Sequence, residues 1–526
     1  MARDAKETTA AMTALRPVHA PRSLAEPLPE AIAATRALIA YLDEAAPLLS
    51  EAEAAHRRAV VAALERLVGE WLVAVAGDHA RCRVLISGSS KLGVAQGGDD
   101  IDVVVVAPSR VSRSSFFDDS ARGFVGRLKA RPEVSDLLAV ATAMVPVVSV
   151  TWDGVKLDVL FAAVDNPEAV VDDASLLDDA HVQAADEATV LALNGPRVTH
   201  ILGSLISDVA TFAIVLRALR LWAKRRGVYS NRVGFLGGIN CAILAAFACQ
   251  LYPKATASVA LERCFAAVAD WPWPVPLMLV QPRKYYSAVG VRQWDVRSGR
   301  ADKMPLITPA LPNTNSAFNV TASSLKILRD EFALAAKVTA RTLLPSPVLD
   351  TAQAAAAVPW ADVFAPGDFA RFERYAYVEC RLGASEERVQ VAGYVGSKLR
   401  WLVLGLEKLG ASRIHPFAEA VDARPTALGW LVGVECSCEP LDPALLDAAL
   451  QDFASSLRRK WTGPVGLSVS VRMLPRADAV ERFPALSPPT GRPMSFMQAL
   501  LKPAAAGGTK RSLSPPGQRK RIKPGA

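Results

Sequence analysis

Cysteine and histidine patterns that bind metals or form disulfide frameworks are missing from this sequence of 526 residues. Its seven cysteines show no CxxC spacing, and its six histidines are dispersed without ligand spacing. An odd number of scattered cysteines, mostly among apolar neighbours, favours reduced and buried thiols over a disulfide framework. The sequence therefore predicts an intracellular protein that is not held together by disulfides.

Segments that would target the chain to a membrane are also scarce. The N-terminus has no apolar signal-peptide core. One uncharged segment, 233–252, is long enough to span a bilayer. Its polar and glycine residues favour a buried helix entered through a glycine-rich turn instead: Gly234, Gly237, Gly238, Asn240 and Gln250. We therefore expect no membrane association.

Charge is distributed unevenly along the chain. The net charge is +8, yet residues 503–526 hold six Lys and Arg residues and no acid, which leaves +2 for the rest. Half of the residues are hydrophobic and a fifth are charged, which is typical of a globular protein. Any attraction to nucleic acid must therefore come from local patches. The tail, with Arg519–Lys523, predicts a nuclear-import signal or an arm that contacts RNA.

A glycine-serine turn lies between two neighbouring predicted strands, and two carboxylates lie at the start of the second strand. A buried strand ends at Ile86, the turn 87–94 follows, and Asp100 and Asp102 open a second strand that continues to Ala107. Because side chains alternate along a strand, both carboxylates share one face, where they offer hard oxygen ligands to Mg²⁺. The turn offers N–H groups and a hydroxyl to a phosphate. Each feature alone is usually structural, but their proximity predicts metal-dependent phosphoryl or nucleotidyl transfer.

A third carboxylate falls inside a predicted β-hairpin. Two β-rich runs, 143–152 and 155–161, flank Asp153-Gly154, a pair that favours a type I′ turn. Asp158 lies among apolar residues of the second run, where a carboxylate is costly unless it is paired or bound to a cation. A satisfied structural aspartate is one reading. Beside two other strand carboxylates, a third ligand is the better one, and it would let two Mg²⁺ ions sit about 3.5–4 Å apart.

These features resemble the DNA polymerase β-like nucleotidyltransferase superfamily: Gly88-Ser89, Asp100-x-Asp102 and a distant Asp158. Further strings look like the central domain of eukaryotic-type poly(A) polymerases, and they occur in the same order. They are LNGPRV (193–198), LRALRLWAKR (216–225), VYSNRVGFLGG (228–238), MPLITPA (304–310) and NSAFNV (315–320). The resemblance runs from about Leu85 into the C-terminal third.

The resemblance implies roles for particular residues. Asp100, Asp102 and Asp158 would bind two Mg²⁺ ions, for which Mn²⁺ is a possible substitute. Phosphate contacts are implied for Ser89 and Tyr229, and contacts to the sugar or base for Asn194, Asn231 and Gly238. The complete implied ATP-binding set is Gly88, Ser89, Asn194, Arg220, Lys224, Tyr229, Asn231, Gly238 and Ile239. Without the resemblance, Asn194-Gly195 would be typical of a plain turn.

The sequence departs from the family pattern at three positions. Ser87 stands where the family has Phe, and Gln96 replaces a common Thr. Arg220 occupies the position of the family's triphosphate lysine; it keeps the charge but binds as a planar fork.

The C-terminal third predicts the order β-α-β-β-α-β. Strands are expected at 375–382, 413–421, 427–436 and 466–473, with helices at 385–410 and 441–461. This is the ferredoxin-like arrangement, which RNA-recognition domains also use. No aromatic string for base stacking on the sheet is present. Candidates for RNA phosphate contacts, or alternatively solvated helix faces, are Lys398, Arg400, Arg458, Arg459 and Lys460.

We therefore expect an α+β protein with a nucleotidyltransferase palm domain, a helical central domain and a C-terminal ferredoxin-like RNA-binding domain. The expected divisions are a flexible N-terminus (1–29), the catalytic domain (30–200), the central domain (201–348), the RNA-binding domain (349–485) and a disordered basic tail (486–526). The expected activity is template-independent addition of AMP from ATP to the 3′ end of RNA, with release of pyrophosphate. The expected setting is a nuclear monomer that works with 3′-end processing factors.

Two other functions remain open at this point. One is a terminal uridylyltransferase with the same palm and a different base choice. The other is an RNA-binding scaffold with a degenerate active site. The set of three aspartates speaks against the scaffold, and the C-terminal domain favours the poly(A) class over the uridylyl class.

Overall fold

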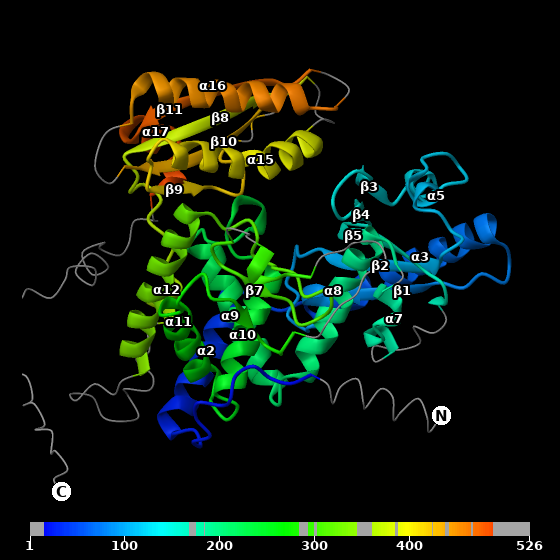
Figure 1. The fold of residues 1–526 in the computed structure, drawn as a ribbon, viewed down its shortest axis with the longest axis horizontal. Coiled ribbons are helices and arrows are strands. Elements are labelled where there is room, and N and C mark those ends of the chain that lie inside the picture. Colours follow the sequence, from blue (N-terminus) through cyan, green and yellow to red (C-terminus); the bar gives the residue numbers. More distant parts are fainter. Residues whose placement is uncertain are drawn as a thin grey trace, which may run out of the picture.

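The chain is described by a computed structural model in which the elements form three groups (Figure 1). The described residues are 15–167, 175–183, 185–282, 293–298, 302–343, 360–383, 388–422, 424, 426–436, 441–463 and 466–487. The expected basic tail lies outside them, apart from its first two residues, as does the first half of the expected flexible N-terminus.

The palm unit is built on a five-stranded sheet with the order β1-β2-β5-β4-β3. Its strands are β1 (Arg83–Ser87), β2 (Ile101–Pro108), β3 (Val134–Val140), β4 (Val147–Trp152) and β5 (Val155–Val164). β2 and β5 are parallel, and the other neighbours are antiparallel. Short helices accompany the sheet: α4 (Gly88–Lys91), α5 (Arg113–Phe117), α6 (Phe124–Lys129), η2 (Ser175–Leu177) and α7 (Ala180–Gln183).

Both faces of this sheet are covered, because its strands alternate between two apolar cores. Val103 and Val105 pack with Trp71 of α3 (Glu51–Ala76) on one face. Val104 and Val106 pack with Leu193 of α8 (Glu187–Ser204) on the other. Asp102 has the parity of Val104, so it belongs to the α8 face, and Ile101 is buried on the α3 face as expected.

The predicted hairpin is confirmed as β4 and β5. Asp153 and Gly154 both have positive φ, at 48° and 76°, as a type I′ turn requires. The first strand begins at Val147, four residues later than the β-rich run suggested.

The helical unit fills the lower part of Figure 1. Its main helices are α2 (Pro29–Ala45), α9 (Val209–Arg225), α10 (Gly238–Leu251), α11 (Ala257–Ala269) and α12 (Ala322–Leu343). Smaller elements complete it: η3 (Asn231–Val233), β6 (Leu277–Met278), η4 (Val296–Ser298), β7 (Leu306–Ile307) and α14 (Trp360–Val363). α10 is buried on nearly all sides, which confirms the expectation for the segment 233–252. Within the described residues, no helix is both long enough and apolar enough to cross a membrane.

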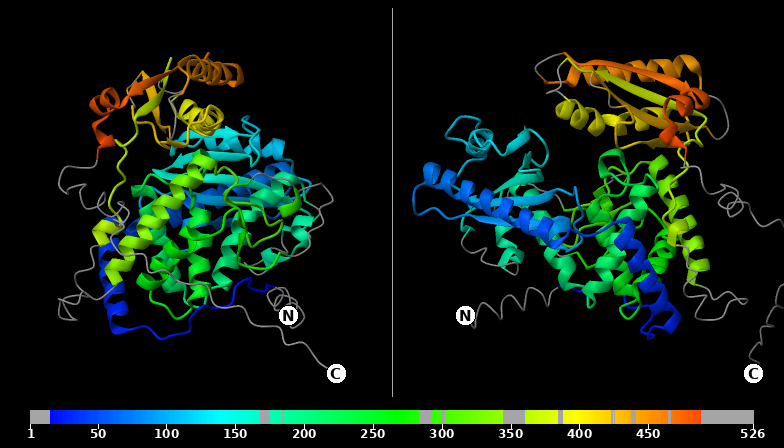
Figure 2. Two further views of the ribbon diagram at one scale, coloured as in Figure 1. Left: turned by 60° about the vertical axis from the view of Figure 1, so that its left-hand side comes forward. Right: turned by 180° about the vertical axis from the view of Figure 1, so that it is seen from behind.

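The C-terminal unit has the predicted order of elements. Its elements are β8 (Arg374–Arg381), α15 (Arg388–Lys408), β9 (Arg413–Pro416), β10 (Ala427–Glu435), α16 (Pro443–Lys460) and β11 (Ser468–Pro475). The antiparallel sheet has the order β11-β8-β10-β9, and α15 and α16 lie together on one face of it (Figure 2). α17 (Arg476–Arg482) and η6 (Pro484–Leu486) pack on the other face through Tyr377 and Phe483. The strand expected at 413–421 ends earlier, at Pro416.

Candidate active site

Four polar side chains form a row across the palm sheet. Asp102 of β2 is the register partner of Asp158 on β5, and it is also the partner of Ser87 on β1. Asp158 is in turn the partner of Ser149 on β4. Register partners on adjacent strands project to the same face. Two carboxylates that are 56 residues apart in the sequence therefore lie side by side, with a serine at each end of the row.

The turn after β1 adds backbone donors at the end of this row. α4 begins directly at Gly88, whose φ of +64° an L-residue with a side chain rarely adopts. The N–H of Gly88 donates to Oγ1 of Thr199 on α8 at 3.4 Å. The sheet, the turn and α8 thus meet at one point, beside Asp102.

Burial, with the charge of neighbouring carboxylates, raises the pKa of both aspartates in the row. Burial, followed by the charges of Asp100, Asp158 and Asp99, raises the pKa of Asp102 to about 7. Burial also raises the pKa of Asp158, and the Ser149 hydroxyl opposes this by donating to Oδ1 at 2.6 Å. Buried carboxylates of like charge are stabilised by a cation. Among the described residues, however, no three His, Cys, Asp or Glu side chains are grouped so that they could hold a metal ion as they stand.

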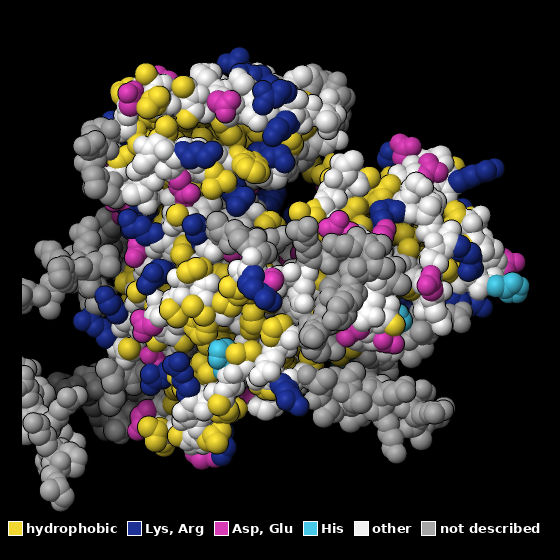
Figure 3. Space-filling model, in the orientation of Figure 1, with side chains coloured by type: hydrophobic (Ala, Val, Ile, Leu, Met, Phe, Trp, Pro, Cys, Tyr) yellow, Lys and Arg dark blue, Asp and Glu magenta, His cyan; other side chains and the backbone are white. Residues whose placement is uncertain are grey.

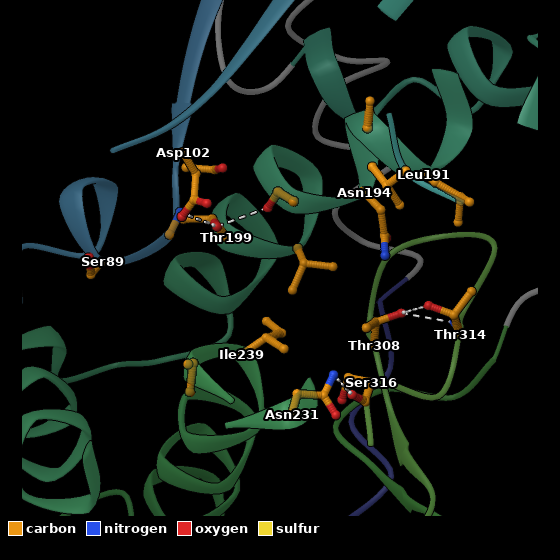
Figure 4. A pocket seen from close by; sticks show the side chains of 18 of the residues that line it. Ser89, Asp102, Leu191, Asn194, Thr199, Asn231, Ile239, Thr308, Thr314 and Ser316 are labelled. Carbon is orange, nitrogen blue, oxygen red and sulfur yellow. Dashed lines mark hydrogen bonds between the residues drawn. The ribbon is translucent and has the colours of Figure 1, made fainter. Parts of the chain in front are cut away.

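A cavity of about 1190 Å³ opens beside the row (Figure 4). Asp102 and Thr199 stand on one side of it, Asn194 and Thr308 on another, and Asn231 and Ile239 below. Most of the predicted site residues line it: Gly88, Ser89, Asp100, Asp102, Asn194, Arg220, Tyr229, Asn231, Gly238, Ile239 and Arg400. Asp158 and Lys224 are not among the residues that line it.

Asn194 is held by a helix and not by a turn. Asn194, Gly195 and Pro196 are all inside α8, so the local turn signal of Asn-Gly is wrong here. Gly195 allows Ser87 to approach, since a Cβ added to Gly195 would lie 3.3 Å from the serine Oγ. The side-chain oxygens of Asn194 and Asn231 are buried and have no hydrogen-bond partner among the described residues.

Tyr229 is placed at the junction of α9 and α10. Its ring lies 5.6 Å from Nζ of Lys224, which is within the range of a cation–π contact. A Cβ added to Gly238 would lie 3.5 Å from the tyrosine hydroxyl. Burial raises the pKa of Tyr229 to about 12, so the phenol is a neutral donor at ordinary pH.

Arg220 also lines the cavity, but both terminal nitrogens of its guanidinium are bonded within the protein. Its buried Nε has no hydrogen-bond partner among the described residues. One terminal nitrogen donates to Oδ2 of Asp99 at 2.7 Å, and the other donates to the carbonyl of Val94 at 2.9 Å. The direct triphosphate contact expected of Arg220 would have to compete with both.

The candidate RNA-binding residues differ in their surroundings. Arg400 of α15 reaches the cavity, where its Nε donates to the carbonyl of Asn319 at 2.8 Å. Lys398 lies over the ring of Tyr394, and Arg458 donates to the carbonyl of Val469. Arg459 and Lys460 are exposed at the end of α16. Lys and Arg side chains gather over α15 and α16 on the surface (Figure 3).

Sequence patterns did not reveal several supporting residues. Arg57 of α3 is buried and donates to the carbonyls of Asp99 and Asp100, at 2.7 and 3.2 Å. Helical periodicity could have indicated that Arg57 is buried, because it shares a helical face with the buried Val60 and Leu64. No sequence pattern identifies Ser149, because only the register of β4 against β5 places it beside Asp158.

Two regions of the chain match family profiles. Residues 18–206 match the poly(A) polymerase nucleotidyltransferase domain, and residues 211–347 match the poly(A) polymerase central domain. These two ranges together cover more than half of the chain. The chain therefore belongs to the poly(A) polymerase family.

Curated relatives agree with this assignment. The chain is 34% identical over 438 residues to nuclear poly(A) polymerase 1 of Arabidopsis thaliana, covering 80% of this chain and 58% of the relative. It is 34% identical over 387 residues to poly(A) polymerase pla1 of Schizosaccharomyces pombe, covering 71% and 65%. For the Dictyostelium discoideum poly(A) polymerase the identity is 33% over 371 residues, covering 68% and 44%. The chain thus spans about half to two thirds of the length of these relatives.

Solved structures resemble the chain only distantly. Cid1, an RNA terminal uridylyl transferase, aligns with 63% of this chain and 98% of its own, at 16% identity and a TM-score of 0.42. CdnC of E. coli MS115-1, solved with ATP, aligns with 63% and 97%, at 16% identity and a TM-score of 0.44. These low TM-scores add nothing to the family assignment.

Proposed function

We propose that this chain adds AMP from ATP to the 3′ end of RNA without a template and releases pyrophosphate. The observation that carries the proposal is the register pairing of Asp102 with Asp158 beside the Gly88 turn. It unites paired carboxylates and a phosphate-binding turn at the edge of one cavity, in a member of the poly(A) polymerase family.

The carboxylates suit a divalent metal. Asp102 and Asp158 are largely buried and repel each other and Asp100, as their raised pKa values indicate, so a cation would offset charge that the protein leaves uncompensated. Asp100, Asp102 and Asp158 would hold it, and we propose two Mg²⁺ ions. When bound, such ions lower the pKa of an attacking hydroxyl and neutralise charge on the phosphates. Ser149 orients Asp158, and Arg57 fixes the backbone that carries Asp100.

The remaining cavity residues would bind ATP. We place the phosphates near Gly88 and Ser89 at the turn and near Tyr229, all of which line the cavity. Lys224, in the last turn of α9, lies over the ring of Tyr229 and would approach the phosphates from there. Asn194, Asn231, Gly238 and Ile239 would then contact the sugar or base. The unpartnered oxygens of Asn194 and Asn231 support this, because buried acceptors without donors are costly unless a ligand satisfies them.

The C-terminal unit would guide the RNA. We propose that residues 349–485 form a ferredoxin-like RNA-binding domain, following the catalytic (30–200) and central (201–348) domains. Its sheet order and its two helices on one face support this fold. α17 covers the opposite face, so RNA would approach the helix face and its basic side chains. Nuclear location, a monomeric state and 3′-end processing factors as partners belong to the same proposal.

A primer-extension assay tests this function. The protein is incubated with a short unstructured RNA, Mg²⁺ and each nucleoside triphosphate separately, with Asp102→Asn as the matched inactive control. Extension by ATP is expected, and EDTA should stop it. Extension by UTP in preference to ATP would identify a terminal uridylyltransferase. RNA binding without extension by any nucleotide would identify a scaffold.

A further inference from the structure

An ion pair joins the carboxylate-bearing loop to the helical unit. Asp99 lies directly before Asp100, and Arg220 lies on α9, 121 residues further along the chain. Their contact of 2.7 Å is almost completely enclosed, with 6% of the arginine side chain and 12% of the aspartate side chain exposed. A pair this well buried is disrupted only at considerable cost, because removing one partner leaves the other charge uncompensated.

Three further sets of hydrogen bonds hold the same loop. The N–H of Gln96 donates to Oδ2 of Asp99 at 3.0 Å, which closes the loop on itself. Arg57 donates to the carbonyls of Asp99 and Asp100 from the opposite side. Arg220 adds a bond to the carbonyl of Val94, at the start of the loop. Two arginines on different helices therefore fix the backbone from which Asp100 and Asp102 project.

Lys224 differs from Arg220 in its surroundings. It lies one turn further along α9, and its Nζ is 3.7 Å from Oδ1 of Asp99, beyond hydrogen-bonding distance. Its side chain is 41% exposed, and Nζ also lies over the face of Tyr229. A lysine that is loosely paired and solvated can turn toward an arriving anion, whereas the guanidinium of Arg220 cannot turn without breaking two hydrogen bonds.

We propose that Asp99 and Arg220 form a positioning pair that fixes the loop bearing Asp100 and Asp102 onto α9, and that Lys224 supplies the positive charge that binds the triphosphate. This inference rests on the proposed function and refines it. In this chain Asp99 neutralises the positive charge that the family pattern places at the position of Arg220. The positive charge available to the nucleotide is that of Lys224, one helical turn further along α9.

Kinetics of three variants separate these roles. Arg220→Lys keeps the charge but cannot hold Asp99 and Val94 together. It should lower kcat about tenfold while KM for ATP changes less than about threefold. Lys224→Met should raise KM about tenfold with kcat nearly unchanged. Asp99→Asn should resemble Arg220→Lys.

Arg217 offers a matched control on the same helix. It is as buried as Arg220, and it likewise binds one carboxylate and one carbonyl, Asp43 at 2.8 Å and Ala46 at 2.9 Å. Its partners lie outside the cavity. Asp43 is 62% exposed, whereas Asp99 is 12% exposed, so Arg217→Lys should lower the melting temperature less than Arg220→Lys does. It should leave kcat nearly unchanged.

Binding and unfolding measurements provide readouts that do not require transfer. Titration with MgATP and with AMP, in the absence of RNA, should show Lys224→Met weakening ATP binding about tenfold and AMP binding little. The decreases in melting temperature of Asp99→Asn and Arg220→Gln should add up to much more than the decrease of the double variant. Each single change leaves one buried charge without its partner, whereas the double variant removes both charges.

A different pattern would overturn the inference. If Arg220→Lys weakens MgATP binding about tenfold and Lys224→Met does not, then Arg220 is the triphosphate contact. Additive melting temperatures for Asp99→Asn and Arg220→Gln would refute the pair. If the wild-type chain extends no RNA, the proposed function fails, while the binding and unfolding results still decide the roles of these three residues.

Discussion

Gly88 and Asp102 are so close that no side chain fits between them: a Cβ added to Gly88 would lie 2.1 Å from Oδ2 of Asp102. Gly88→Ala should therefore displace a central carboxylate of the site as well as strain the backbone, since φ at Gly88 is +64°. We expect RNA extension to fall at least a hundredfold, which corresponds to about 2.7 kcal/mol of lost transition-state stabilisation. Primer extension with ATP measures this loss.

Gly93→Ala is the matched control for that substitution. Gly93 lies in the same loop with φ of +69°, but nothing lies within 4 Å of an added Cβ. Backbone strain alone should lower the folding stability of this variant by about 1 kcal/mol, and it should keep most of its activity. Equal activity losses in the two variants would show that strain, and not the contact with Asp102, decides the outcome.

Ser149→Ala tests how Asp158 is oriented. The hydroxyl donates to Oδ1 of Asp158 at 2.6 Å and lowers the pKa of that carboxyl, so its removal should raise the pKa further and loosen the side chain. We expect kcat to fall about tenfold, with KM for ATP nearly unchanged. Ser149→Thr, which keeps a hydroxyl on a β-branched residue suited to a strand, should restore part of the rate.

Mg²⁺ should stabilise the wild-type chain through the same carboxylates. At a concentration ten times its Kd, a ligand bound only by the folded state adds about 1.4 kcal/mol of stability. Asp102→Asn removes one ligand and also relieves the repulsion among the buried carboxylates. This variant should therefore melt at a higher temperature than the wild type in EDTA and gain little on addition of Mg²⁺.

The exposed Asp119 provides the comparison for that measurement. Its side chain is 74% exposed and pairs with Lys129 at the surface. Asp119→Asn should respond to Mg²⁺ as the wild type does, in calorimetric scans of the whole chain. A response lost equally in both variants would point to a general effect of charge and would contradict binding at the row.

Acid should weaken the start of α8, which carries Asn194 and Thr199. Asp186 caps this helix by accepting from the N–H of Thr189 at 2.7 Å, and its carboxylate also pairs with Arg113 at 2.6 Å. The bond from Arg113 is the main cause that lowers the pKa of Asp186 to about 2. The ionised Asp186 carboxylate therefore stabilises the folded protein. This stabilisation is complete above about pH 3.9, the pKa of an aspartate in the unfolded chain, and disappears as pH falls toward 2.

Two substitutions separate the ion pair from the cap. Asp186 is 52% exposed, so Asp186→Asn, which still caps the helix, should cost less than about 1 kcal/mol above pH 5. Asp186→Ala also loses the cap and should cost about 1 kcal/mol more. Urea unfolding between pH 2 and 7 measures both differences. A deficit of Asp186→Asn that persists at pH 2 would contradict the assignment.

Local chemistry made much of the fold predictable. The Asp153-Gly154 pair marks its own turn, because few residues other than Gly, Asn and Asp adopt positive φ readily. The β-α-β-β-α-β order follows from apolar spacing that changes between strand and helix periods. At 194–196 the local signal failed, because packing of α8 between the sheet and the helical unit overrides the turn preference of Asn-Gly.

Only those site residues that belong to a recognisable sequence motif could be predicted. Paired aspartates and a glycine-serine turn are visible in the sequence. The partner of Arg220 is not, because Asp99 lies 121 residues away and meets it only after the helical unit packs against the palm. Arg400 was expected on an RNA-binding surface, and its place in the cavity wall depends in the same way on how α15 docks.

The parallel pairing of β2 with β5 has a consequence for how this enzyme family tolerates change. The offset between Asp102 and Asp158 is set by main-chain hydrogen bonds along eight paired positions, from Ile101 to Pro108. Replacing apolar side chains on either strand leaves that offset intact. Inserting or deleting one residue within a strand would turn one aspartate to the opposite face. Apolar substitutions that fit the two cores therefore keep the two aspartates side by side, whereas a change in strand length separates them.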